Sequence, residues 1–140
     1  MVDPDVVRRR LRQIDRRVAA LRAIAGGREG DFVDDDALQA QAERHLQVAV
    51  QSAIDIALHI LAEDSSETPE DYATAFLLLA RIGLIDRPLA DRLRSAAGLR
   101  NVLVHTYLDV DPRRLWAHLR DLDDLIAFAA AVESYVQRSG

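Results

Sequence analysis

The chain has 140 residues, and its 49% hydrophobic content includes only 5% aromatic residues, so Ala, Leu, Ile and Val dominate. This composition suits helix–helix packing around one core, and we expect a single domain over residues 1–140. The absence of cysteine excludes disulfides and thiolate metal sites and favours a reducing cytoplasm. The net charge of -5 excludes a general polyanion binder, so any contact with nucleic acid needs a local basic patch. We expect neither a membrane span nor a signal peptide.

The first predicted helix begins at Asp3-Pro4, where Asp3 can cap the helix and Pro4 fits its first turn. Apolar residues then recur every three or four positions, which is the pattern of one buried stripe: Val7, Leu11, Ile14, Val18, Leu21 and Ala25. The other faces carry many arginines, which we interpret as a solvated surface rather than an RNA-binding one: Arg8, Arg9, Arg12, Arg16, Arg17 and Arg22. Residues 28–35 are expected to form a polar loop.

The second predicted helix covers residues 37–63 without a break and would be about 40 Å long at roughly 1.5 Å per residue. That length makes it the central element of a bundle. His45 and His59 lie too far apart on it to share a metal ion. Asp55 and His59 are one turn apart, but no third ligand is evident, so we expect ordinary hydrogen-bonded histidines.

Three more helices are expected in the rest of the chain. The first follows the cap and proline at Thr68-Pro69 and stops near Gly83. The second starts at residues 86–88 and runs toward residue 103. The third follows Asp111-Pro112 and continues as one long helix to about residue 136. The predicted fold is therefore an all-α, antiparallel bundle of four or five helices.

The segment 100–107 carries most of the reactive side chains, with Arg100, Asn101, His105 and Tyr107 close together. Cleavage of RNA requires a base for the 2′-hydroxyl, an acid for the leaving oxygen and positive charge for the phosphorane. An imidazole serves as acid or base near neutral pH, and a guanidinium binds phosphate, so no metal or cofactor is needed. Asn101 could orient the phosphate or the imidazole.

The spacing of Arg100 and His105 raises a geometric question, because five residues turn about 140° around a regular helix. The two side chains meet only if they reach around the helix, if the helix ends between them, or if two copies of the segment meet at a two-fold axis. Asp109 or Asp111 could orient the imidazole, although capping is the favoured role of Asp111. From spacing alone, a structural role is the commoner explanation of such an Arg–His pair.

A basic rim around this segment is a further possibility, to which five arginines could contribute: Arg87, Arg92, Arg94, Arg113 and Arg114. Ordinary surface pairing of these arginines with neighbouring acids is an equally good interpretation.

The motif carried by Arg100, Asn101, His105 and Tyr107 resembles the Arg-x4-His-x-Tyr motif of HepT-like toxins in the HEPN superfamily. Residues 43–57 also resemble that family's long second helix, and residues 68–86 resemble its next helix and turn. The resemblance covers most of residues 5–136.

This resemblance implies a HEPN-like bundle that dimerises and acts as a metal-independent endoribonuclease, the toxin of a type VII-like toxin–antitoxin pair. Arg100 and His105 would be catalytic, with Asn101 assisting. The implied partner is a nucleotidyltransferase antitoxin of the MntA type, which would transfer AMP to Tyr107 and so block RNA. The competing hypothesis is a non-catalytic helical binding module that pairs with a nucleotidyltransferase.

Overall fold

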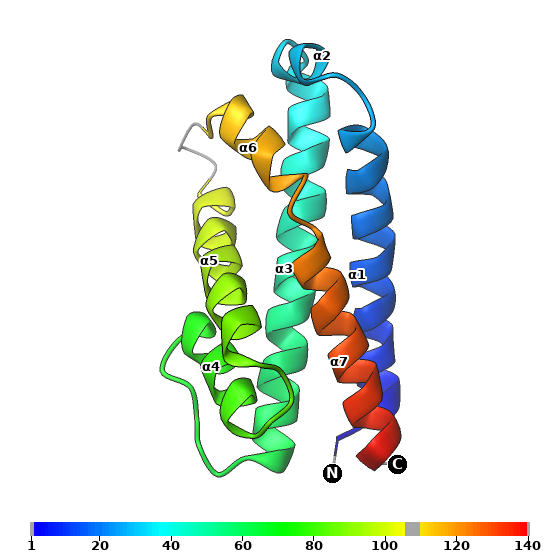
Figure 1. Cartoon of the computed structure of the whole chain (residues 1–140). Helices are drawn as coiled ribbons and strands as arrows, with labels where there is room; N and C mark the ends of the chain where they lie inside the picture. The colour runs from blue at the N-terminus through cyan, green and yellow to red at the C-terminus, as the bar shows by residue number, and fades with distance from the viewer. Residues whose placement is uncertain (1, 106–109, 140) are drawn as a thin grey trace.

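The computed structural model describes residues 2–105 and 110–139, and these residues form seven α-helices and no strand. The helices have the following bounds, and Figure 1 shows their arrangement: α1 Pro4–Ala25, α2 Glu29–Val33, α3 Asp36–Asp64, α4 Tyr72–Arg81, α5 Arg87–Leu103, α6 Pro112–His118 and α7 Asp123–Ser139. The predicted all-α bundle is confirmed, with five longer helices and the two short helices α2 and α6.

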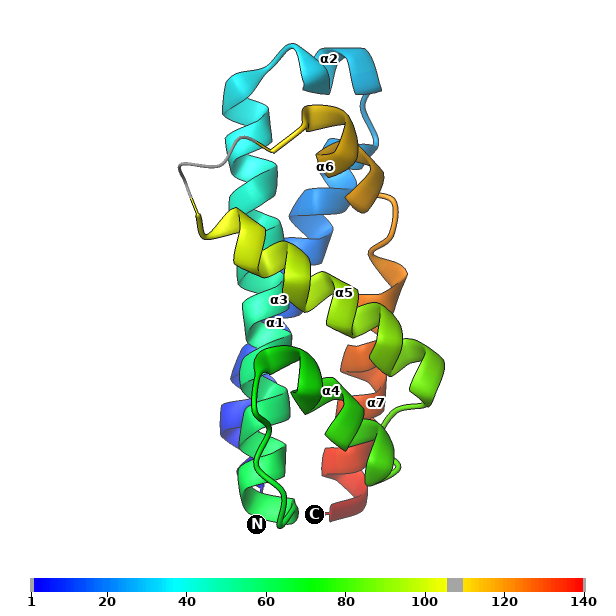
Figure 2. The ribbon, with the colours of Figure 1, turned by 90° about the vertical axis from the view of Figure 1, so that its left-hand side faces the viewer.

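The long helix α3 is the axis around which the others pack. In Figure 1, α1 and α7 lie on one side of α3, and α4 and α5 lie on the other. Figure 2 shows that α5 runs obliquely across α3 and that α2 and α6 sit together at one end. The last turn of α5 is therefore carried alongside the middle of the central helix.

Aspartate side chains cap most of the helix starts. Asp3 accepts from the amide of Asp5 at 3.0 Å, and Asp86 accepts from the amide of Leu89 at 2.9 Å. The predicted cap at Asp111 is also present. The predicted start at Thr68 is wrong, because α4 begins at Tyr72 with Asp71 as its cap.

Two other predictions of element boundaries are corrected. Residues 28–35 contain the helix α2, which forms because Phe32 is buried against Trp116, with ring centroids 5.2 Å apart. The expected single C-terminal helix is interrupted between α6 and α7, at residues 119–122. The chain changes direction there because α6 packs against α2 and α3, whereas α7 packs against α1, α3 and α5.

The core explains why α3 is so apolar. Its length and composition would allow it to cross a membrane, but 56% of its most apolar window is buried inside the bundle. Phe76 of α4 and Phe128 of α7 meet edge to face beside it, with ring centroids 5.8 Å apart, and both are fully buried. A central helix covered by neighbours on several sides needs apolar residues on several faces.

Candidate functional site: the end of helix α5

The helix α5 ends between Arg100 and His105, which is one of the three arrangements that would let their side chains share a site. The last helical residue is Leu103, and Val104 is the C-cap. The amide of His105 already donates to the carbonyl of Val102 at 3.2 Å, as in a tightened final turn. Arg100 thus stands in the last turn, where a cation also complements the helix dipole, and exposed His105 follows the cap.

The guanidinium of Arg100 is held by residues from three helices. Its Nε donates to Oε1 of Gln51 on α3 at 2.7 Å, and its Nη1 donates to Oδ1 of Asn101 at 3.2 Å. The Cζ atom lies 5.5 Å from the ring centroid of Tyr72 on α4, within range of a cation–π contact. The side chain of Tyr72 is 39% exposed, so its ring lies at the surface beside Arg100.

Gln51 belongs to a chain of polar contacts that sequence reasoning missed. Its Nε2 donates to Oδ1 of Asp55 at 2.8 Å, and Oδ2 of Asp55 pairs with Nη1 of Arg10 on α1 at 3.1 Å. Asp55 thereby fixes which end of the Gln51 amide faces Arg100. The only local signal was the one-turn spacing of Gln51 and Asp55 along a single helix.

Both histidines of α3 have ordinary hydrogen-bond partners, as predicted. His59 accepts from the amide of Asp3 at 3.2 Å, and Nδ1 of His45 lies 3.0 Å from Nη1 of Arg17. Burial and the nearby charge of Arg17 both lower the pKa of His45. In the part of the chain that the structure describes, no three His, Asp or Glu side chains gather closely enough to hold a metal ion.

A polar groove of about 400 Å³ extends from Arg100 across α3 to α1. Among the described residues that line it, Asp55 is the single acidic one, Val48 is apolar, and the others are basic or polar: Arg10, Gln13, Arg17, Arg44, Gln47, Gln51, Ser52 and Arg100. Such a lining provides many N–H donors and few acceptors with a negative charge, which is the chemistry that binds phosphate groups.

A second hollow of about 370 Å³ lies between α4 and α5, and Asn101 lines it together with Asp71, Tyr72 and Arg94. Hydrogen bonds from Thr74 lower the pKa of Asp71, which favours the ionised carboxylate. The bond from the Thr74 side chain has the larger effect, and the bond from its backbone has the smaller one. The hydrogen bond that Asn101 accepts from Arg100 holds its side chain beside the guanidinium. The structure thus brings Arg100 and Asn101 together, with His105 at the same helix end.

The remaining predicted site residues are distributed differently. Tyr107 and Asp109 lie outside the residues that the structure describes. Four of the five arginines of the possible basic rim pair with acids, as the interpretation of ordinary surface pairing predicted. Arg87 and Arg94 pair with Asp91, Arg92 pairs with Asp124, and Arg113 pairs with Glu29. Such exposed pairs contribute little to stability, but they place a carboxylate beside each cation. A basic rim at these positions is therefore poorly supported.

Comparison with known proteins identifies the family. Residues 10–132 match the family described as Ribonuclease HepT-like. The chain belongs to the HepT-like family. The resemblance of the segment 100–107 is thus part of a match that covers most of the chain, and Gln51, Asp55 and Tyr72 lie within the same matched range.

Two curated members of the HepT-like family are named nucleases. The mRNA nuclease HepT of Shewanella oneidensis is 32% identical over 126 residues, which is 87% of this chain and 94% of that protein. The tRNA nuclease HepT of Aphanizomenon flos-aquae is 32% identical over 115 residues, covering 82% of this chain and 78% of that protein. The similarity to the Shewanella oneidensis nuclease thus covers most of this chain and most of that protein.

Solved structures of the family have the same fold. The tri-AMPylated HEPN toxin of Shewanella oneidensis, in complex with its MNT antitoxin, aligns with a TM-score of 0.86 and 28% identity over 94% of this chain and 99% of that chain. A toxin–antitoxin structure with AMP-PNP aligns with a TM-score of 0.81 and 29% identity over 93% and 98%. This chain thus shares its fold with a toxin that is AMPylated in its solved structure.

Proposed function

We propose that this HepT-like protein is the toxin of a type VII-like toxin–antitoxin pair, a cytoplasmic endoribonuclease silenced by AMP transfer to Tyr107. Arg100 and His105 would cleave RNA without a metal ion, and Asn101 would assist. One observation supports this most: a guanidinium anchored from three helices stands in the last turn of α5, beside an arginine-lined groove. The named family members are RNA nucleases.

The chemistry follows from what each side chain can do. The 2′-oxygen of the RNA attacks the adjacent phosphorus while the bond from phosphorus to the 5′-oxygen breaks. His105 takes the proton of the 2′-hydroxyl or returns one to the leaving 5′-oxygen, since an imidazole can do either. Arg100 stays charged and stabilises the negative charge that accumulates on the phosphorane oxygens.

A complete acid–base pair needs two proton-transferring groups, and a homodimer would supply the second one. If the ends of α5 from two copies meet at a two-fold axis, one cleft contains two arginines and two histidines. One imidazole then acts as base and its counterpart as acid. The end of α5 is open to such a contact, because Asn101, Val102 and His105 are exposed in the monomer.

The regulatory step predicts a specific result for Tyr107→Phe. The phenol oxygen attacks the α-phosphorus of ATP, pyrophosphate leaves, and the phenol proton is lost, so a phenylalanine at this position cannot accept AMP. The parent protein should gain AMP mass and lose RNA cleavage after incubation with the nucleotidyltransferase and ATP, because bulky anionic AMP repels RNA. Tyr107→Phe should gain no AMP and should keep cleaving RNA.

The two other tyrosines provide the controls for this experiment. Tyr72 contacts Arg100, and the hydroxyl of Tyr135 donates to Asp64, an arrangement in which burial and that bond raise the pKa of Tyr135 to about 12. Tyr72→Phe and Tyr135→Phe should both still accept AMP at Tyr107. Peptide mapping that finds the AMP on either of these residues would refute the proposed switch.

Gln51 provides a test of how Arg100 is positioned. In Gln51→Leu the acceptor for Nε of Arg100 is lost, so the guanidinium is free to leave its present orientation. We expect the single-turnover cleavage rate to fall about tenfold or more, since small misplacements of a catalytic group are costly. Gln41→Leu is the matched control, because Gln41 is an exposed residue of α3 that does not line this groove, and its expected rate is near that of the parent. Equal rates for the two variants would rule out this role for Gln51.

A second candidate function is a non-catalytic partner of a nucleotidyltransferase. The observation in its favour is that the structural relatives were solved as toxin–antitoxin complexes. This alternative predicts a stable complex with the nucleotidyltransferase and no cleavage of any RNA by the purified protein. A cleavage assay with the isolated chain separates the two functions.

A further inference from the structure

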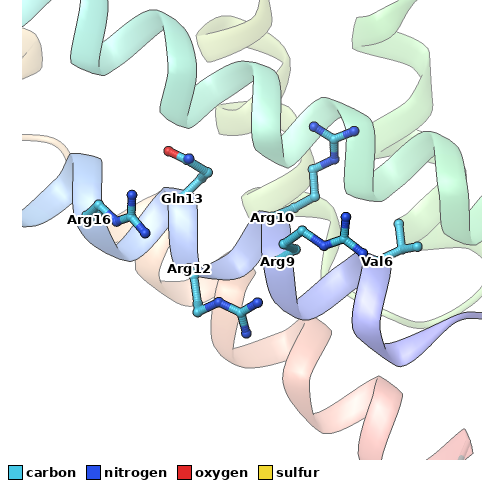
Figure 3. Close-up of a pocket in the computed structure, with 6 residues that line it drawn as sticks. All are labelled: Val6, Arg9, Arg10, Arg12, Gln13 and Arg16. Carbon is cyan, nitrogen blue, oxygen red and sulfur yellow. The ribbon is translucent and has the colours of Figure 1, made fainter.

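The exposed side of α1 carries an unusual concentration of positive charge. Arg9, Arg12 and Arg16 lie on adjacent turns of one helix face, and Figure 3 shows their side chains with those of Arg10 and Gln13 around a shallow hollow of about 430 Å³. We call Arg9, Arg12 and Arg16 the α1 arginine face. Among the described residues that line this hollow, none is acidic.

The α1 arginine face differs in its pairing from the exposed arginines that have an acidic neighbour. Arg8, Arg22, Arg81 and Arg87 each pair with a carboxylate. Within the described ranges 2–105 and 110–139, no hydrogen bond or ion pair involves the side chains of Arg9, Arg12 or Arg16. Like charges three or four residues apart destabilise a helix. Three unpaired guanidiniums in that arrangement, on a chain with a net charge of -5, are thus available to bind an external anion.

The α1 arginine face is continuous with the groove that contains Arg100. Arg10 and Gln13 line both the shallow hollow on α1 and the polar groove across α3. A strand bound at Arg100 can therefore follow arginine and glutamine side chains across α3 onto α1. At 1.5 Å per residue, the stretch from Arg9 to Arg16 adds about 10 Å to this path.

From this continuity we infer that Arg9, Arg12 and Arg16 bind backbone phosphates of the RNA strand outside the bond that is cleaved. This inference rests on the proposed ribonuclease function, and it assigns the substrate path rather than the chemistry. Single-stranded RNA fits because a positively charged groove that follows the backbone is how proteins bind such strands. From the sequence, the arginines of the first helix are interpreted as a solvated surface. The inference from the structure differs, because it assigns RNA phosphates as the ligand of three of them.

Other occupants fit this surface less well. A second copy of the chain would bring the same arginines face to face at a two-fold axis, and like charges repel. A protein partner would need an apolar centre to its interface, whereas Val6 and Val48 are the only apolar residues among the described ones that line the hollow and the groove. An acidic protein surface is nevertheless a distinct outcome of the experiment below.

The experiment measures RNA affinity as a function of salt concentration, with His105→Ala present in every protein to prevent cleavage. The probe is a short, fluorescently labelled single-stranded RNA of mixed sequence, titrated between about 50 and 200 mM salt. The variant is Arg9→Gln, Arg12→Gln and Arg16→Gln together. The matched control makes the same change in charge at three ion-paired arginines, Arg22, Arg81 and Arg87.

Loss of three phosphate contacts should lower the slope of log affinity against log salt by about 2, since each contact on a single strand contributes about 0.7. The Kd at low salt should rise on the order of tenfold to a hundredfold. The control should bind within about twofold of the parent, and lysine at the three positions should largely restore binding, since a phosphate responds to charge. Arg12→Gln alone should lower the slope by about 0.7 and provides a milder variant should the triple variant fold poorly.

Three results would overturn the inference. In the first, the triple variant and the control lose the same affinity. In the second, the triple variant binds RNA as the parent does. In the third, the triple variant still binds RNA but no longer binds the nucleotidyltransferase, which would assign the α1 arginine face to a protein partner.

The proposed function is tested separately, by cleavage with Arg100 and His105 intact. A parent that binds RNA through α1 but never cleaves it would refute the ribonuclease function alone.

Discussion

Arg100→Ala and His105→Ala are each expected to lower the rate of RNA cleavage by about a hundredfold or more. Removal of a general acid or base typically costs a factor of about 10² to 10⁴, and removal of a group that stabilises developing charge costs about 10² to 10³. At the end of α5, His105 is exposed and Arg100 is only partly buried, and neither belongs to the hydrophobic core, so neither substitution opens a cavity there. The measurement is single-turnover cleavage of RNA by purified protein, together with growth arrest in cells.

The controls for this experiment come from the same protein. Arg81→Ala removes an exposed arginine paired with Glu67, and His118→Ala removes an exposed histidine on α6. Neither residue lies in the groove next to Arg100, so both variants should cleave RNA at the rate of the parent. A folded Arg100→Ala or His105→Ala variant that cuts RNA as fast as these controls would contradict the proposed catalytic roles.

Phe128→Ala should have the largest effect on stability, lowering the free energy of unfolding by about 3 to 5 kcal/mol. The Phe128 side chain is fully buried and meets Phe76 edge to face at 5.8 Å, so alanine removes the ring contact and leaves a cavity between α4 and α7. Domains of this size are stable by only about 5 to 15 kcal/mol, so a large share of the stability is at risk. Urea unfolding followed by circular dichroism measures the change.

Phe128→Leu is the matched variant for the core prediction. Leucine keeps most of the buried volume, so its cost should stay near about 1.5 kcal/mol or below. The difference between Ala and Leu then reports on the cavity rather than on the loss of aromaticity. A cost for Phe128→Ala as small as that of Phe128→Leu would mean that α7 repacks, and that the core is less tightly specified than the full burial of Phe128 suggests.

The regular parts of the fold could be predicted from the sequence because their signals are local. Val7, Leu11, Ile14, Val18 and Leu21 form one stripe with helical spacing, and all five are buried. The caps at Asp3 and Asp111 follow from an acid placed before a proline. These features depend on neighbours within about one turn, which a sequence displays directly.

The errors come from tertiary contacts that the local pattern does not contain. Phe32 is a lone aromatic in a polar stretch, and only the packing of Trp116 against it explains the helix α2. The interruption between α6 and α7 was hidden because buried Leu119 and Leu122 continue the apolar stripe through it. Thr68 and Asp71 are both suitable caps, and the structure selects Asp71.

The candidate site divides in the same way. Arg100, Asn101 and His105 could be selected because their chemistry is concentrated in six consecutive positions. Gln51 could not, since it contacts Arg100 from 49 positions away along the chain. The electrostatic character of the site could not be predicted from the sequence either, because four of the five rim arginines pair with acids whereas the arginines of the α1 arginine face do not.

The most direct test of metal-free cleavage by Arg100 and His105 is to identify the product ends formed by purified protein in the presence of a metal chelator. Attack by the 2′-oxygen leaves a 2′,3′-cyclic phosphate on one fragment and a free 5′-hydroxyl on the other, and both ends should form at the full rate without metal. An RNA with 2′-deoxyribose at the cleaved position should resist cutting. Fragments with 5′-phosphates, or cleavage that stops when metal is removed, would contradict a reaction carried by a guanidinium and an imidazole.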